Sequence, residues 1–87
     1  MSCTVELIRV AQKQLDRITG RYYKDIVETI TTLRENPRPL GTRKLAESGL
    51  WRIRIGRYRV VYTIDDKEHL VVIVRVTKRS EDTYRRL

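Results

Sequence analysis

The sequence has very few of the residues that build disulfides, metal centres and membrane spans. It holds one cysteine and one histidine in 87 residues. A single cysteine permits no internal disulfide and no cysteine metal cluster, and a single histidine cannot form a two-histidine acid–base pair. The longest apolar run is Leu70–Val74, far shorter than the roughly 20 residues that span a bilayer. We therefore expect no metal, no cofactor and no membrane-spanning helix.

The N-terminal segment also lacks the pattern of a signal peptide. Residues Met1–Glu6 do not place a charged stretch before an apolar one, as secretory signals do. Together with the near absence of cysteine, this favours a cytoplasmic protein without a membrane partner.

An excess of positive charge distinguishes the composition. The chain has 19 lysines and arginines against 11 acidic residues, a net charge of +8. Hydrophobic residues make up 40% and charged residues 34%, which is typical of a folded chain, and the length predicts one domain over residues 1–87. The charge favours a polyanionic partner such as a nucleic acid, because binding releases the counterions of the polyanion. An acidic protein partner fits the charge as well, and a generic basic protein is the third alternative.

The apolar pattern changes from helical to alternating along the chain. Apolar residues recur every three or four positions in the first half, and every second position after Gly49. Leu40–Gly49 is polar and predicts a loop, with one helical turn around Arg43–Glu47. The expected elements are a strand over Cys3–Val10, helices over Ala11–Ile18 and Tyr22–Glu35, strands over Leu50–Ile55, Tyr58–Ile64 and Leu70–Thr77, and a last helical turn within Ser80–Leu87. This order predicts an α+β fold, with an N-terminal strand and a helix hairpin packed on a mainly antiparallel twisted sheet.

The dipeptide Gly56-Arg57 predicts a hairpin between the strands that flank it. Glycine at the first of two central positions suits a type II′ turn. Such a turn would pair Arg54 with Arg59 and Trp51 with Tyr62. Because side chains alternate between the two faces of a sheet, Trp51 and Tyr62 would face the core.

The opposite face of this hairpin would carry Arg52, Arg54 and Arg59. Like charges directly opposite each other destabilise a strand pair by roughly 0.2–1 kcal/mol. Guanidinium groups, in contrast, bind phosphates with two hydrogen bonds and stay charged at every relevant pH. The hairpin from Trp51 to Tyr62 is therefore predicted to meet a phosphate backbone, such as that of an RNA. A solvated outer face that is merely basic is the alternative.

Three segments of this region resemble the RelE/ParE toxin superfamily of bacterial and archaeal toxin–antitoxin systems. They are Lys44–Leu45, the run LWRIRIG at Leu50–Gly56 and the run YRVVY at Tyr58–Tyr62. The order of elements is similar over nearly the whole chain. The resemblance implies a toxin with a RelB-like antitoxin, held in a hetero-oligomeric complex. RelE-like members cut mRNA in the ribosomal A site, whereas ParE-like members poison DNA gyrase.

The RelE-like branch implies a site at five positions of this sequence. Arg52 and Arg54 match its basic pair, Arg59 matches its third-strand arginine, and Arg79 and Tyr84 match its C-terminal arginine and tyrosine. The resemblance therefore implies a metal-independent endoribonuclease, with the ribosome and mRNA as partners. In the reaction that the resemblance implies, the 2′-OH of the RNA attacks the adjacent phosphate, arginines stabilise the charge and Tyr84 stacks on a base.

One departure concerns proton transfer. The best-understood relatives carry lysines at the basic pair, whereas arginine at both positions is effectively never deprotonated. Lys44, Glu47 and Glu81 are the candidate proton acceptors, and Lys44 and Lys78 are also candidate RNA-binding residues. His69 lies beyond the Asp65–Glu68 turn and is expected at the surface. A gyrase poison and a basic module that only binds RNA or antitoxin are the alternative functions.

Overall fold

The described part of the chain, residues 2–45 and 48–78 of a computed structural model, forms two helices and one sheet of five strands. This confirms the predicted α+β fold. The expected turn within Ser80–Leu87 lies outside the described residues. The elements are β1 (Thr4–Leu7), α1 (Arg9–Asp16), α2 (Gly20–Thr32), β2 (Arg43–Leu45), β3 (Leu50–Ile55), β4 (Tyr58–Asp65) and β5 (Leu70–Lys78).

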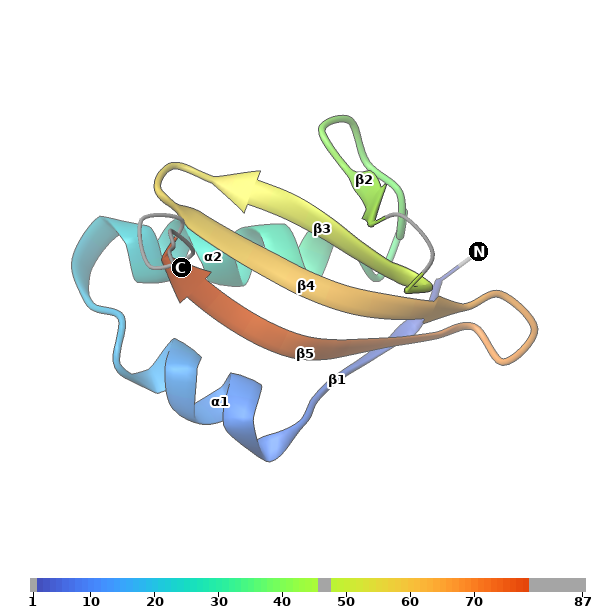
Figure 1. The fold of residues 1–87 in the computed structure, drawn as a ribbon, viewed down its shortest axis with the longest axis horizontal. Coiled ribbons are helices and arrows are strands. Elements are labelled where there is room, and N and C mark those ends of the chain that lie inside the picture. The colour runs from blue at the N-terminus through green and yellow to red at the C-terminus, as the bar shows by residue number, and fades with distance from the viewer. Residues whose placement is uncertain (1, 46–47, 79–87) are drawn as a thin grey trace.

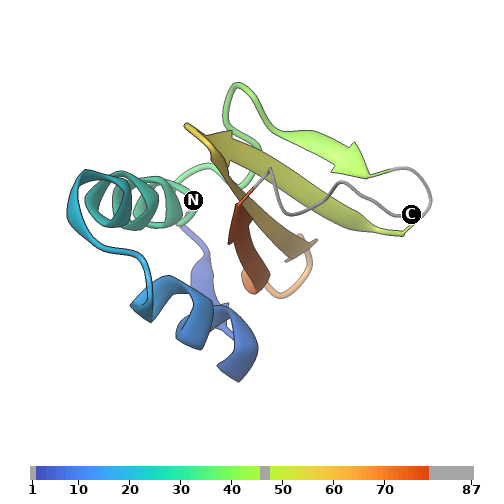
Figure 2. The ribbon, with the colours of Figure 1, turned by 60° about the vertical axis from the view of Figure 1, so that its left-hand side comes forward.

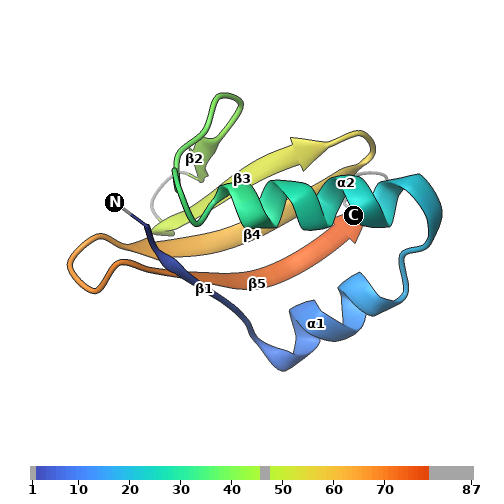
Figure 3. The same cartoon turned by 180° about the vertical axis from the view of Figure 1, so that it is seen from behind.

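The strands lie in the order β1-β5-β4-β3-β2 (Figure 1). Strands β2 to β5 are antiparallel to their neighbours, and β1 runs parallel to β5 at one edge. Both helices lie on the same side of the sheet (Figure 2), and from behind, α2 crosses β3 and β4 while α1 lies beside β5 (Figure 3). The sheet therefore has one face toward the helices and one face that neither helix covers.

The core fills the space between the helices and the sheet. Its largest fully buried side chains come from α2, the end of α2 and the strands β4 and β5, and they are Tyr62, Ile26, Leu33, Ile73, Val60 and Val71. The helices contribute because their apolar residues follow the 3.6-residue period, which places them on one stripe. Strand β5 lies between two neighbours, and its residues Leu70–Val74 are apolar at every position.

The β3–β4 hairpin confirms the predicted register. Ile55 pairs with Tyr58, and the pairing continues without a shift to Trp51 and Tyr62. A type II′ turn requires a positive φ at its first central residue and a negative φ at its second. Gly56 has a φ of 60°, and Arg57 does not have a positive φ, since His69 is the only described non-glycine residue that does. The turn is held against α2, because a Cβ on Gly56 would come within 2.8 Å of the Tyr22 ring.

Helix boundaries differ from the prediction by two or three residues. Helix α1 begins at Arg9 rather than Ala11, since Ile8 is still extended and the predicted strand stops at Leu7. Helix α2 begins at Gly20 and ends at Thr32. Beyond Thr32 the backbone continues as tighter turns, with the amides of residues 34 and 35 donating to carbonyls three residues back.

The predicted helical turn around Arg43–Glu47 is wrong. Residues Arg43–Leu45 form the edge strand β2, which pairs with Leu50–Arg52 of β3. Three residues are too few to show a period, so this strand is defined by its partner rather than by its own pattern.

Candidate nucleic-acid interface

The sheet face opposite the helices carries five arginines, Arg43, Arg52, Arg54, Arg59 and Arg75, and we call it the arginine face. Arg54 lies directly opposite Arg59 in the hairpin, as the sequence predicts. Arg43 lies opposite Arg52 in the β2–β3 pair. Four of these arginines therefore form two cross-strand pairs of like charge.

Arg75 joins this face because β5 contains a β-bulge. Val61 pairs with Arg75, whereas the next residue, Tyr62, pairs with Ile73, which leaves Val74 as the extra residue. The bulge reverses the alternation of β5 at this point. Ile73 and Val76 both reach the core, and Arg75 points to the other face and is exposed. Val61 then lies between Arg52 and Arg75 in the register.

The arginines differ in exposure. Arg52 and Arg59 are half-buried, and both take part in further interactions, while the other three are exposed. Within residues 2–45 and 48–78, no carboxylate lies within ion-pair distance of Arg43, Arg54 or Arg75. This part of the face is therefore a concentrated positive field that can attract an external anion.

A pocket of about 180 Å³ opens on the arginine face. Apolar side chains from four strands and three polar ones surround it, and they are Leu45, Leu50, Val61, Val74, Arg59, Arg75 and Thr77. The face thus combines charge with an apolar hollow.

Lys44 and Lys78 are not brought together with the arginines. Lys44 pairs with Trp51, whose side chain packs at the edge of the core, so its register position is on the helix side of the sheet. The Lys44 Nζ lies 5.9 Å from the centre of the Trp51 ring. Lys78 pairs with Tyr58 and lines a hollow with Gln14 of α1. Trp51 itself faces the helix side, as its predicted parity requires.

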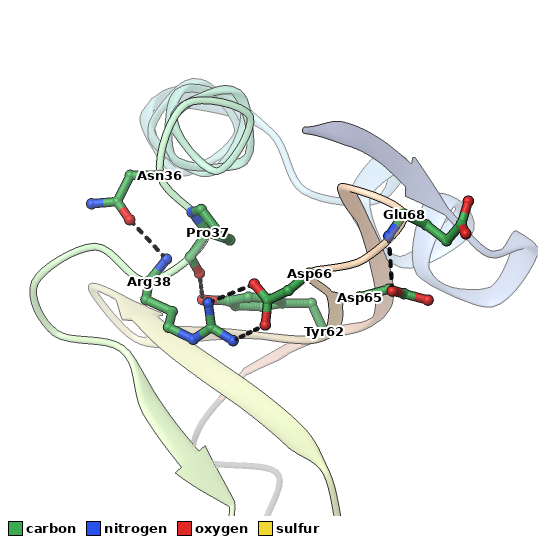
Figure 4. Close-up of polar contacts among 7 residues, drawn as sticks. All are labelled: Asn36, Pro37, Arg38, Tyr62, Asp65, Asp66 and Glu68. Carbon is green, nitrogen blue, oxygen red and sulfur yellow. Dashed lines mark hydrogen bonds and ion pairs between the residues drawn. The ribbon is translucent and has the colours of Figure 1, made fainter. Parts of the chain in front are cut away.

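A second set of polar contacts fixes the loop that leads into β2 (Figure 4). Both guanidinium NH₂ groups of Arg38 donate to the carboxylate of Asp66, at 3.0 and 2.8 Å, and the guanidinium carbon lies 4.9 Å from the centre of the Trp51 ring. The Tyr62 hydroxyl donates to the Pro37 carbonyl at 2.8 Å. The loop is thereby attached to β3, to β4 and to the β4–β5 turn, which positions β2 and its arginine.

These contacts set the protonation of two groups. Burial raises the pKa of Tyr62 above its ordinary value of 10.0, while the hydrogen bond with Thr42 and the charge of Arg38 act in the opposite direction. The hydrogen bonds from Arg38 lower the pKa of Asp66 below its usual 3.8. Both groups belong to the loop attachment rather than to the arginine face.

Four candidate residues, Glu47, Arg79, Glu81 and Tyr84, lie outside the described residues. His69 is exposed beside the β4–β5 turn, as expected. In the described ranges, no three histidine, cysteine or acidic side chains lie close enough to hold one metal ion. No helix of that part of the chain is long and apolar enough to cross a membrane.

Comparison with known proteins identifies the family. The sequence model of the ParE toxin of type II toxin–antitoxin systems (parDE) matches residues 5–83. The toxin RelG of Mycobacterium tuberculosis is 37% identical over 90 residues, which cover 99% of this chain and 100% of that protein. The chain belongs to the RelE/ParE toxin superfamily. It is a toxin of the type II toxin–antitoxin class.

Solved structures of this superfamily share the fold. The toxin superposes with a TM-score of 0.81 on the archaeal RelE–RelB complex of Pyrococcus horikoshii, at 27% identity, covering 91% of this chain and 97% of that one. The toxin–antitoxin complex RelBE2 of Mycobacterium tuberculosis gives a TM-score of 0.79 at 30% identity, covering 91% of this chain and 100% of that one. The resemblance found in the hairpin therefore extends over nearly the whole chain.

Sequence reasoning missed Arg43 and Arg75 of this toxin. Arg43 belongs to strand β2, which the sequence does not predict. Regular alternation from Ile73 would place Arg75 on the core face, and only the bulge places it on the arginine face. One signal could have found Arg75. Val76 is buried in the core opposite Val60, and adjacent residues of a strand point to opposite faces, so Arg75 must point to the face away from the core.

Proposed function

We propose that the toxin is a ribosome-dependent, metal-independent endoribonuclease that cuts mRNA in the ribosomal A site. The observation that carries this proposal is the pairing of Arg54 with Arg59, next to Arg52, on the arginine face. A like-charge pair costs stability, and its presence is explained if the cluster binds a phosphate. The RelE-type naming of a solved relative at 30% identity supports the RelE-like branch.

RNA supplies its own nucleophile for this reaction. The 2′-hydroxyl loses its proton and its oxygen attacks the adjacent phosphorus, the bond to the 5′-oxygen breaks, and the 5′-oxygen takes up a proton. The products are a 2′,3′-cyclic phosphate and a 5′-hydroxyl. Arg54 and Arg59 neutralise the scissile phosphate as its charge increases, and Arg52 holds the neighbouring phosphate. Arg79 would stabilise the leaving oxygen and Tyr84 would stack on a base, both from the C-terminal segment.

The arginine face stabilises charge rather than accepting protons. Guanidinium groups are not deprotonated in proteins, and Lys44 lies on the helix side of the sheet. Proton transfer from the 2′-hydroxyl is then assigned to Glu47, Glu81 or the ribosome. Dependence on the ribosome follows naturally, because a site without a tuned base relies on an RNA that is already oriented for in-line attack.

Primer extension on translated mRNA tests this proposal. Cells that express the toxin should show cuts within codons, and Arg59→Gln should remove them. Arg57→Gln is the matched control, since Arg57 is exposed at the turn and outside the cluster while the charge change is the same. If the mRNA stays intact while the toxin still stops growth, the proposal is wrong. Intact mRNA with RNA binding would instead indicate a module that binds without cutting.

Poisoning of DNA gyrase is the second candidate function. The observation in its favour is the matching family model, which is described for ParE toxins. A gyrase poison would cause DNA cleavage complexes to accumulate in cells and in reactions with purified gyrase. Such complexes without mRNA cuts would replace the first proposal by this one.

A RelB-like antitoxin is the proposed protein partner, in a hetero-oligomeric complex. Two solved relatives are toxin–antitoxin complexes. An acidic segment of the partner would neutralise the charge of the arginine face and block access to it. The site of action on ribosomes makes the cytoplasm the proposed location. Co-expression with a short neighbouring reading frame that encodes an acidic protein should restore growth. Failure of every neighbouring frame to do so would contradict this partner.

A further inference from the structure

The pocket between Arg59 and Arg75 is not used by the proposed cleavage chemistry. Its apolar lining comes from Leu45, Leu50, Val61 and Val74, and its polar lining includes the two arginines. Apolar side chains gathered within a strongly basic face are unexpected, because phosphate binding requires only the charge. They call for an occupant that has both an apolar surface and negative charge.

The β-bulge of β5 builds this pocket. The extra residue, Val74, lets Ile73 and Val76 both enter the core, and it turns Arg75 to the arginine face. With regular alternation from Ile73, Arg75 would point into the core. Bulges are local features that redirect a side chain, and they are frequent beside active sites.

We propose that this pocket and Arg75 form a nucleotide subsite, in which the pocket holds one base and Arg75 holds the phosphate that flanks the scissile one on the side away from the phosphate held by Arg52. The proposal rests on the proposed function, because Arg59 is there assigned to the scissile phosphate. The pocket is smaller than the ~300–1,000 Å³ of sites for drug-sized ligands, and it therefore suits one flat group rather than a whole nucleotide.

The spacing of the two arginines agrees with this assignment. Arg59 pairs with Thr77, so Arg75 is its diagonal neighbour on the next strand. Diagonal neighbours on one sheet face lie roughly 7–8 Å apart, a distance that long side chains can narrow or widen. The two guanidinium groups can thus hold successive phosphates, while the pocket between them receives the base. Guanidinium planes also stack on bases, so either arginine can cover the seated ring.

RNA binding by the purified toxin tests the charge part of the proposal. The probe is a fluorescently labelled hexauridylate, and its anisotropy is measured from 50 to 200 mM salt. Arg75→Gln should weaken binding and reduce the slope of log affinity against log salt by about 0.7, the contribution of one phosphate in a single strand. Arg57→Gln carries the same charge change at the exposed turn and should leave the slope unchanged.

A second probe tests whether the pocket binds the base. An oligonucleotide with the same phosphates but abasic sugars should bind wild type at least about tenfold more weakly, since it loses roughly 50 Å² of apolar contact in the pocket in addition to any base stacking elsewhere. Val74→Thr has the same shape and adds a hydroxyl to the pocket. It should bind hexauridylate more weakly while binding the abasic oligonucleotide as wild type does.

The outcomes separate this inference from the function on which it rests. If wild type cuts mRNA on ribosomes and Arg59→Gln does not, but Arg75→Gln keeps the wild-type salt slope, the inference alone is overturned. If Arg75→Gln weakens only an acidic antitoxin peptide and not RNA, the pocket belongs to a protein partner and the inference is again overturned. If wild type neither binds hexauridylate at 50 mM salt nor cuts mRNA, both proposals are wrong.

Discussion

Replacing Arg54 by glutamine should make the fold more stable and the toxin less active. The turn closes between Ile55 and Tyr58, so the next pair, Arg54 and Arg59, does not share hydrogen bonds, and in such pairs the Cα atoms approach to about 4.5 Å. Two guanidinium groups held about 7 Å apart in water repel each other by about 0.6 kcal/mol. This value falls within the roughly 0.2–1 kcal/mol of measured cross-strand terms.

The expected gain of about 0.6 kcal/mol corresponds to a melting temperature that rises by roughly 2 to 5 °C at low salt, given about 4–8 °C per kcal/mol for a domain of this size. In 1 M salt, where the Debye length is about 3 Å, the gain should nearly disappear. Activity should fall about 100- to 1,000-fold, as for the loss of one charge-stabilising donor. Thermal melts at both salt concentrations, with Arg57→Gln as the control, measure the first effect, and mRNA cleavage measures the second.

The reasoning would be refuted by a variant that is less stable than wild type at low salt. It would also be refuted by a gain in stability that is the same in 1 M salt, because the gain would then come from strand propensity rather than from relieved repulsion. A more stable variant with full activity would remove the functional explanation for the arginine pair.

Three further predictions concern the scaffold around the site. Tyr62→Phe should lower the free energy of unfolding by about 1–3 kcal/mol, since it leaves a carbonyl without its donor, and denaturant titration measures this. Because burial raises the Tyr62 pKa, wild type should lose stability as the pH rises from 10 through the raised value, and the phenylalanine variant should lack this component. Arg38 lowers the pKa of Asp66, so this ion pair stabilises the fold above pH 3.8 and the effect is lost as the pH falls through the lowered value; Asp66→Asn should flatten that part of an acid titration. Gly56→Ala should cost about 1–3 kcal/mol, because φ is 60° there and the new Cβ would meet the Tyr22 ring at 2.8 Å, and an equal midpoint of thermal unfolding would contradict this.

The hairpin could be predicted from the sequence because two independent signals agree there. Strict alternation assigns each side chain to a face, and Gly56 fixes the turn and with it the register. One of the two pairs of like charge, Arg54 with Arg59, follows directly from these two rules. The buried positions of Val60 and Tyr62 follow from them as well.

The rest of the arginine face depends on contacts between distant segments. Strand β2 has only three residues, and its pairing with β3 rather than its own pattern places Arg43 beside Arg52. Strand β5 is apolar at every position from Leu70 to Val74, so its sequence gives no parity signal before Arg75. A loop has no parity, so the sequence alone does not separate Lys44 from the arginines, whereas its pairing in strand β2 assigns it to the helix side.

The central claim is that the arginine face cuts mRNA on the ribosome. Its most direct test is a reconstituted reaction with purified ribosomes, end-labelled mRNA and either wild type, Arg59→Gln or Arg57→Gln. The account predicts a cut in the A-site codon that leaves a 2′,3′-cyclic phosphate, with wild type and Arg57→Gln active and Arg59→Gln at least about 100-fold slower. A single 2′-deoxy nucleotide at the cut site should abolish cleavage by all three. Equal rates for the two variants, or a cut that persists in the deoxy substrate, would contradict the account.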